Sequence, residues 1–600
     1  MMRNISGGFF SAESRRNSLS SRRSSAAVLG LLALGGALAY PAPLARAAEK
    51  NDASDKGNAA DLAKKGESSS AVTDADVIKF IDQQIRQGWK DAEVSPSPAA
   101  TENEWCRRVF LDVLGRVPSV GELQAFLNDK SRNKKETLVN RLLDSDEYVE
   151  EYARNWTTIW TNLLIGRPKS DRDEARDLVD REGMQQYLRR TFLANKPYDK
   201  FVFELISSTG SNKPGEENYN GAVNFLLDNL QENAATATAK TARYFLGLQV
   251  QCTQCHNHPF NDWKQDQFWG MNAFFRQTAA LRTFQGREIA SAQLENQDFA
   301  GEGNDPKEAE IYYELRNGTL VVAYPTFVDG TKINPSGYSD EVNRRLELAK
   351  LVVKSEFFGQ AIANRMWAHF LGYGFTKPID DLGPHNAASH PELLAYLGKQ
   401  FASHGHDLRQ LIRWITLSEA YSLSSRFGGK AAKNKTDDPS LGVKPLFSHF
   451  YIRQMQAEEL YESLLVATEA HKTQGSYMEQ EKTKGDWLRQ FTLAFGTDEG
   501  DESTTFNGTI PQALMMFNGE LIKKATSAEK GSFLHQIATG NLKPHARIDY
   551  LYMAALSRRP SSNEMKIANQ LLAARGGDPV AAMQDVWWAL LNSNEFILVH

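Results

Sequence analysis

Apolar residues recur at every third or fourth position over most of this chain, which is the spacing of one face of an α-helix. The run from Tyr148 to Leu164 follows this spacing with large apolar side chains. A second run, Ala234 to Leu248, leads directly into a segment with two cysteines. The apolar stretch from Asp266 to Arg276 comes after that segment and should pack over it. The pattern therefore predicts a mainly α-helical protein.

Two segments at opposite ends of the chain share a pattern. Arg116-Val117-Pro118-Ser119 is followed by Glu122, and Arg558-Arg559-Pro560-Ser561 is followed by Glu564. A Leu-Leu-Asp-Ser or Leu-Leu-Asn-Ser sequence then marks the second helix of each segment. The two segments could be related helical hairpins. They could equally be two uses of the same favourable helix start, in which a serine caps the helix and a glutamate three residues later completes the cap.

A single segment, from Glu310 to Val328, has the pattern of β-strands. Its two short apolar runs flank Arg316-Asn317-Gly318, and Asn-Gly between strand-forming residues is a strong signal for a hairpin turn. The polar stretch before it, about 283 to 306, interrupts the helical spacing and is expected to connect two domains. Residues 427–440 and 472–485 are also polar and are expected to be loops. The predicted fold is two helical domains with a small β-hairpin insertion between them.

The N-terminus has the features of an export signal. Four arginines lie between residues 15 and 23, a short apolar run follows from Ala26 to Tyr40, and Ala45-Arg46-Ala47 offers a cleavage site. An uncleaved membrane anchor is the alternative, although the apolar run is short for a membrane span. We expect an exported protein of the periplasm or cell surface, with no membrane span in the mature chain.

The resulting organisation has five parts. They are a signal peptide (1–47), a polar and disordered tether (48–72), an N-terminal helical domain (73–282), a linker with a β-hairpin (283–330) and a C-terminal helical domain (331–600). The 600 residues are 41% hydrophobic and 24% charged, which is typical of a soluble globular protein. The formal net charge of -5 gives no basic excess, so nucleic acid is not an expected partner.

The segment from Gln251 to Phe260 carries the most specific chemistry. It contains Cys252-x-x-Cys255-His256, the spacing that attaches a c-type haem, and it uses two of the chain's 3 cysteines. In this interpretation the two sulfurs form thioethers with the haem, and His256 is an axial ligand of the iron. The sixth iron ligand would be a methionine or histidine from elsewhere, with Met184 and Met271 as candidates. Such a protein would perform redox or electron-transfer chemistry with an unidentified redox partner.

Two other interpretations use the same residues. Cys252, Cys255 and His258 recur every three positions and could bind a Zn or Fe ion, with His256, Asp262 or a distant histidine as the fourth ligand. Alternatively, the two cysteines could form a disulfide in an oxidising compartment. In either case the protein could be a secreted structural or binding protein, with a cell-surface component or glycan as its partner. The sequence leaves all three interpretations open.

Other candidate sites are less specific. Five histidines of the C-terminal half could suggest a second metal site, although positions at helix ends are the more common explanation for such residues: His369, His385, His390, His404 and His406. Asp380-Asp381 could ligate or catalyse, but capping or surface roles are more common for such carboxylates. The chain lacks the local signatures of hydrolases and nucleotide-binding enzymes, so the sequence leaves open whether it is an enzyme.

Several of these motifs together resemble a known pair of families. Arg116–Ser119, Leu142–Ser145 and Gln251–Phe260 resemble the N-terminal domain of large secreted planctomycete-type proteins. Four later motifs resemble the C-terminal domain that is paired with it: Asn364–Gly372, Asp381–Gly383, Ser389–Leu394 and Leu417–Tyr421. These are the domain-of-unknown-function families 1549 and 1553, which are labelled cytochrome-associated. The resemblance covers nearly all of the expected mature chain and implies a link to cytochromes without specifying a reaction.

Overall fold

The computed structural model describes residues 72–167, 178–426, 437–472, 476–496 and 509–600. The chain from residue 71 to residue 600 forms one compact unit. The expected signal peptide and tether lie outside the described residues and stay predictions, as do the expected domain boundaries. Within the described ranges, no helix is both long and apolar enough to cross a membrane.

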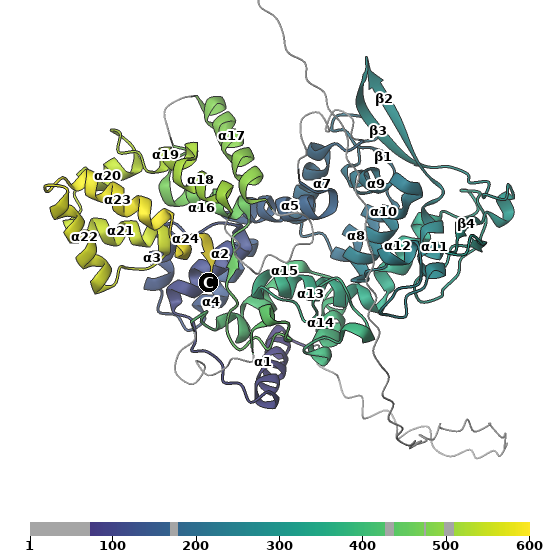
Figure 1. The fold of residues 1–600 in the computed structure, drawn as a ribbon, viewed down its shortest axis with the longest axis horizontal. Coiled ribbons are helices and arrows are strands. Elements are labelled where there is room, and N and C mark those ends of the chain that lie inside the picture. Colours follow the sequence, from purple (N-terminus) through teal and green to yellow (C-terminus); the bar gives the residue numbers. More distant parts are fainter. Residues whose placement is uncertain (1–71, 168–177, 427–436, 473–475, 497–508) are drawn as a thin grey trace, which may run out of the picture. The chain divides into compact units, whose positions relative to one another are not determined.

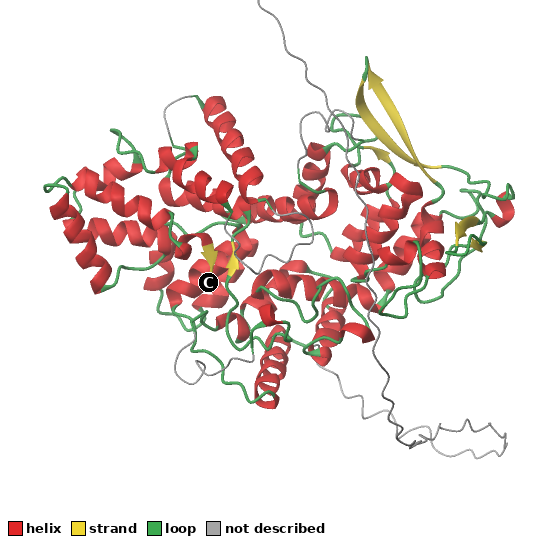
Figure 2. Cartoon of the chain, in the orientation of Figure 1, coloured by secondary structure: helices red, strands yellow, loops and turns green. Residues whose placement is uncertain are grey.

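Helices make up most of this unit, as the sequence pattern predicts (Figures 1 and 2). The helices before the β region are α1 (Asp74–Asp91), α2 (Glu102–Leu114), α3 (Val120–Asn128), α4 (Lys134–Asp144), α5 (Val149–Ile165), α7 (Arg181–Leu193), α8 (Tyr198–Ser207), α9 (Asn224–Asn229), α10 (Gln231–Thr241) and α11 (Gln265–Asn272). Those after it are α12 (Arg344–Lys354), α13 (Glu356–Leu371), α14 (Pro391–Ser403), α15 (Leu408–Thr416), α16 (Ala457–Thr468), α17 (Tyr477–Phe495), α18 (Ile510–Asn518), α19 (Glu520–Ala525), α20 (Phe533–Thr539), α21 (Pro544–Leu556), α22 (Ser562–Ala574), α23 (Pro579–Leu591) and α24 (Asn594–Ile597). The mainly α prediction is confirmed.

The strands form small antiparallel sheets, drawn in yellow in Figure 2. The predicted hairpin around Asn317-Gly318 is confirmed as β4 (Ile311–Glu314) and β5 (Leu320–Ala323). The other pairs are β2 (Thr278–Gln285) with β3 (Glu288–Asn296), β3 with β1 (Gly210–Ser211), and β6 (Arg453–Gln454) with β7 (Leu598–Val599).

The hairpin of β2 and β3 corrects the sequence interpretation of residues 283–306. This stretch was expected to be a polar connection, but residues 283–296 lie largely in strands. Only β3 has a buried face, where Ala292 and Leu294 are buried, while Leu281 and Phe284 of β2 are exposed. Because most of β2 faces solvent, its sequence lacks the alternation that identifies a half-buried strand.

The stretch 472–485 is a second correction. It was expected to be a loop, but its second half is the start of α17. Ser476 and Glu479 form a capping box at this start, and the buried residues Trp487, Phe491 and Phe495 come only after the first two turns. The first two turns are exposed and polar, so the sequence carries no apolar period there.

The two similar segments near the chain ends form the same structure. In each, a serine and a glutamate form a capping box, and an arginine bridges two glutamates. Each arginine also donates to the carbonyl oxygen of the residue that follows it. The bridged sets are Arg116 with Glu122 and Glu151, and Arg558 with Glu564 and Glu595. A helix cap alone does not require a bridging arginine, so the first hairpin (α3 and α4) and the last hairpin (α22 and α23) share more than the cap.

Helix α2 contacts the last part of the chain directly. Arg107 of α2 is buried and donates to the carbonyl oxygens of Ala555 (2.7 Å) and Phe596 (2.9 Å). Asn103 donates to the carbonyl oxygen of Ser557 (2.7 Å). Burial lowers the pKa of Arg107 to about 10, which leaves it charged at neutral pH. These hydrogen bonds therefore fix α2 to α21 and α24, the helices on either side of the last hairpin.

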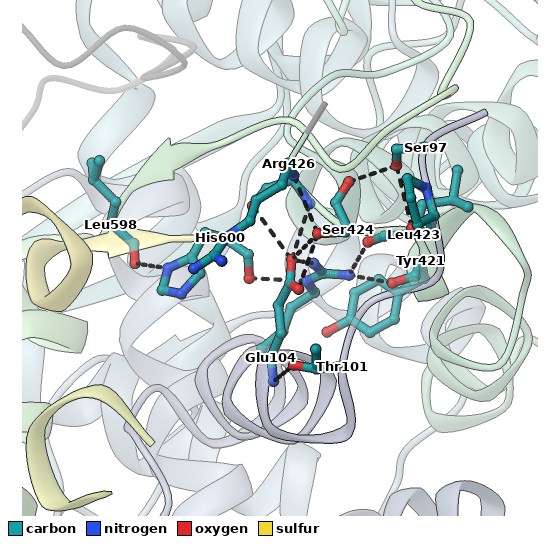
Figure 3. A network of polar contacts seen from close by, with 12 residues as sticks. Ser97, Thr101, Glu104, Tyr421, Leu423, Ser424, Arg426, Leu598 and His600 are labelled. Atoms are coloured by element: carbon teal, nitrogen blue, oxygen red, sulfur yellow. Dashed lines mark hydrogen bonds and ion pairs between the residues drawn. The ribbon is translucent and has the colours of Figure 1, made fainter. Parts of the chain in front are cut away.

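A neighbouring polar network also joins α2 to later parts of the chain (Figure 3). Glu104 accepts hydrogen bonds from the hydroxyl of Ser424 (3.0 Å) and from the backbone N–H of Ser425 (3.0 Å). The buried Arg108 donates to the carbonyl oxygens of Leu423 (2.9 Å) and His600 (3.2 Å). Residues more than 300 positions apart in the sequence are fixed together by these bonds.

Candidate functional site

The cysteine motif follows an irregular end of α10. The last helical residues, Ala242–Leu246, form a π-helical turn, and Gly247 then ends the helix with a φ of 66°. A short 3₁₀ turn, Gln251–Gln254, carries the first cysteine. Single π-helical turns often occur at functional sites.

Side chains other than the cysteines hold this turn in place. Thr253 is buried, and its hydroxyl donates to the carbonyl oxygen of Val250 (2.5 Å). From α11, the indole of Trp269 and the amide of Gln265 both donate to the carbonyl oxygen of Gln254, at 3.0 and 3.2 Å. The expectation that the stretch after the motif packs over it is confirmed. The cysteine side chains are not needed to keep the turn folded.

The thiols of the motif differ from the third cysteine. Cys252 and Cys255 are exposed and free, whereas Cys106 is buried. Burial raises the pKa of the Cys106 thiol, so this group stays protonated and unreactive at neutral pH. Cys106 is therefore a core residue, and the two exposed thiols are available for attachment or ligation.

The ring of His256 is held in one tautomer. Its Nδ1 atom lies 2.7 Å from the carbonyl oxygen of Asn257. Since a carbonyl oxygen can only accept, Nδ1 must carry the proton in this hydrogen bond. The Nε2 atom of neutral His256 therefore has a free lone pair, which is the arrangement that histidine ligands of metals generally use.

His258 has the opposite arrangement. The backbone N–H of Phe260 donates to its Nδ1 atom at 3.2 Å. Nδ1 must therefore carry the lone pair, and the proton of neutral His258 lies on Nε2. For His258 to bind an ion, it would have to lose this hydrogen bond or shift its proton. The structure thus separates two histidines that the sequence treats as equal candidates.

A histidine from the second half of the chain lies beside the motif. The ring centroids of His258 and His385 are 6.5 Å apart, and His385 is paired with Asp381 at 2.8 Å. The loop that carries these two residues is fixed to the motif segment by a hydrogen bond from the N–H of Leu382 to the carbonyl oxygen of Gly247 (2.7 Å). Sequence reasoning treated these as separate candidates, and the fold brings them together.

The other four candidate histidines have separate structural positions. His369 contacts the carbonyl oxygen of Asp112 at 3.1 Å. His390 and His404 lie at the two ends of α14, and burial lowers the pKa of His390 to about 4. His406 lies 3.6 Å from an aspartate and has a positive φ of 57°. Over the described part of the chain, no three histidine, cysteine or carboxylate side chains are grouped to hold an ion.

The remaining candidates are distributed as follows. Asp380 forms an ion pair with Arg243 at 3.0 Å, which is a structural role. Asp262 is exposed. Met184 and Met271, the candidate sixth ligands of a haem, are buried in the hydrophobic core, at 0% and 1% exposure. Neither of these two methionines therefore lies at the surface where Cys252 and Cys255 are exposed.

Comparison with protein families places this site in context. Residues 80–280 match the family described as a protein of unknown function (DUF1549), and residues 344–572 match the one described as a protein of unknown function (DUF1553). The cysteine motif lies in the first region and His385 in the second. Neither the curated proteins nor the solved structures contain a match. The chain thus carries a DUF1549 region followed by a DUF1553 region.

Proposed function

We propose that this protein is an exported redox protein with a c-type haem attached to Cys252 and Cys255 and ligated by His256. The observation that carries the proposal is the hydrogen bond from Nδ1 of His256 to the carbonyl oxygen of Asn257. This bond orients the ring and leaves Nε2 free to bind iron without any proton transfer. A haem bound there would supply an iron that takes up and releases one electron.

The thiols and their surroundings fit the same role. Both sulfurs are exposed and come from one turn, so a haem and its attachment machinery could reach them together. The turn is fixed by Thr253 and α11, which leaves the thiols free to react without unfolding the segment. Phe260 next to them is 85% exposed, and it offers an apolar contact for a redox partner.

A metal ion is the second candidate, and one observation favours it. His385 lies close to His258 and is paired with Asp381, and many histidine ligands of metals are oriented by a carboxylate in this way. An ion bound by Cys252, Cys255, His258 and His385 would tie the two matched regions together in a structural or binding protein. His258 would first have to give up its hydrogen bond from Phe260.

The cofactor is tested by producing the protein with an export signal in a host that has haem-maturation machinery. Thioether-bound haem stays attached after denaturation, so the denatured band should stain for haem and give a pyridine-haemochrome spectrum. Cys252→Ala or Cys255→Ala should reduce or abolish the stain, because each removes one of the two thioether bonds. Cys106→Ala is the matched control, and it should retain the stain because this thiol is buried elsewhere.

The ion gives a different outcome in the same preparation. Near-stoichiometric Zn or Fe without a Soret band would support the ion and reject the haem. His258→Ala and His385→Ala should then weaken metal binding, whereas His404→Ala at the end of α14 should not. Protein with neither haem nor metal would reject both candidates.

A further inference from the structure

A cavity of about 650 Å³ lies where the first hairpin meets α16 and α17. The first hairpin and the start of α5 belong to the region that matches the first family, and α16 and α17 belong to the region that matches the second. Ligand sites often lie at such junctions, and the volume is within the usual range of small-molecule sites. None of the cavity residues belongs to the cysteine motif.

The charged groups that line this cavity are already paired with one another. Arg116 donates its N–H groups to Glu122, Glu151 and the carbonyl oxygen of Val117, and has none left for a ligand. The other pairs are Arg154 with Glu462 (2.7 Å), Lys484 with Glu481 (2.8 Å) and Lys472 with Glu469 (2.9 Å). A charged ligand would add a charge beside pairs that are already formed, whereas a neutral ligand would leave the charges of the lining as they are.

Each pair places hydrogen-bond donors beside acceptors. A guanidinium or ammonium group only donates, and a carboxylate only accepts, while a hydroxyl group does both. Neighbouring hydroxyl groups on a ligand can therefore accept from Arg154 or Lys484 and donate to the carboxylates beside them. His471 adds no charge, because burial lowers its pKa.

The cavity also has an apolar part. Leu465, Val466 and Leu488 contribute to its lining, and the last two are only partly buried. A sugar ring presents hydroxyl groups at its edge and C–H groups on its faces. It would match both the paired charges and this apolar strip.

We propose that this cavity binds a neutral oligosaccharide of two to four sugar units. This proposal does not depend on the haem, so the two proposals can be tested separately. The hydroxyl groups of the sugar form hydrogen bonds with the intact ion pairs, and its C–H groups contact the leucine and valine side chains.

The first experiment tests the class of ligand. Cellotriose, xylotriose, mannotriose and chitotriose are offered to the purified protein, and binding is detected by saturation-transfer NMR and quantified by calorimetry. Trigalacturonic acid and triglycine are the charged and peptide comparisons. We expect at least one neutral trisaccharide to bind and the two comparisons not to. Absence of binding by all four, or preferential binding of triglycine or of the acidic sugar, would overturn the proposal.

The second experiment locates the site. Arg154→Met removes a donor from the cavity, and Lys484→Met removes another, so either should weaken saccharide binding at least tenfold. Arg575→Met is the matched control, because Arg575 is paired with Asp585 at 2.7 Å on an exposed surface outside the cavity. Each variant is checked for folding by circular dichroism. Unchanged affinity in folded Arg154→Met and Lys484→Met would place the bound sugar elsewhere and reject the assignment.

Discussion

Replacing Glu122 by Gln tests the bridge that the two hairpins share. The Glu122 carboxylate accepts from the guanidinium of Arg116 at 2.8 and 2.9 Å and from the backbone N–H of Ser119 at 2.7 Å. Burial by itself would raise the pKa of this carboxyl group, but the hydrogen bonds and charge of Arg116 outweigh burial and lower the pKa from 4.5 to about 2. Gln keeps an oxygen for the helix cap and removes the charge.

The size of the effect follows from this pKa. Because the folded-state pKa lies below the unfolded-state value, ionised Glu122 stabilises the fold, fully above pH 4.5 and progressively less as the pH falls towards 2. The difference corresponds to about 3 kcal/mol of unfolding free energy at pH 7 and to about 2 kcal/mol at pH 3.5. Glu122→Gln should therefore destabilise the protein by about 3 kcal/mol at pH 7, with a smaller loss at pH 3.5.

Urea unfolding followed by tryptophan fluorescence at the two pH values measures this loss. Glu564→Gln in the second hairpin is the matched control. The side chain of its arginine partner is 27% exposed, against 7% for Arg116, so solvent screens this pair more and the loss should be smaller. A Glu122→Gln protein as stable as the original at pH 7, or a loss that grows on acidification, would refute the reasoning.

Three further predictions concern other parts of the chain. Asp112→Asn should lower the unfolding free energy by about 3–5 kcal/mol, because it leaves the buried Arg453 without one of its carboxylate partners, and an unchanged urea midpoint would contradict this. Gly247→Ala should lower the melting temperature, with a cost of about 1–2 kcal/mol, because the residue has a φ of +66° and its new Cβ would lie 2.9 Å from Leu382; equal melting temperatures would be the contrary result. Alkylation of the folded, cofactor-free protein, followed by mass spectrometry, should modify the two exposed thiols and spare Cys106 until denaturant is added; rapid modification of all three would count against its burial.

The parts of the fold that the sequence predicts are those with one buried face. The helical spacing of apolar residues identifies most helices, and Asn317-Gly318 identifies the hairpin of β4 and β5. The hairpin of β2 and β3 and the start of α17 are missed for the same physical reason. Both are exposed over much of their length, so their sequences lack the regular spacing of apolar residues that burial of one face produces.

The sequence predicts only the part of the candidate site that is formed by neighbouring residues in the chain. The spacing of Cys252, Cys255 and His256 can be read directly, because attachment chemistry depends on neighbours in the chain. The tautomers of the two motif histidines depend on how the backbone carbonyl and N–H groups of the turn point, which only the fold determines. The approach of His385 depends on a loop from a distant part of the chain, and no local pattern marks it.

The contacts of Arg107 have a consequence for how the chain is made. Its carbonyl partners lie 448 and 489 positions later in the sequence, so α2 cannot complete its buried hydrogen bonds until the ribosome has added α21 and α24. During most of synthesis the guanidinium has to stay hydrated, because an unpaired charge in a core is costly. The early helices therefore remain accessible to chaperones and proteases until α21 and α24 have been made. A chain truncated before these helices would be readily degraded.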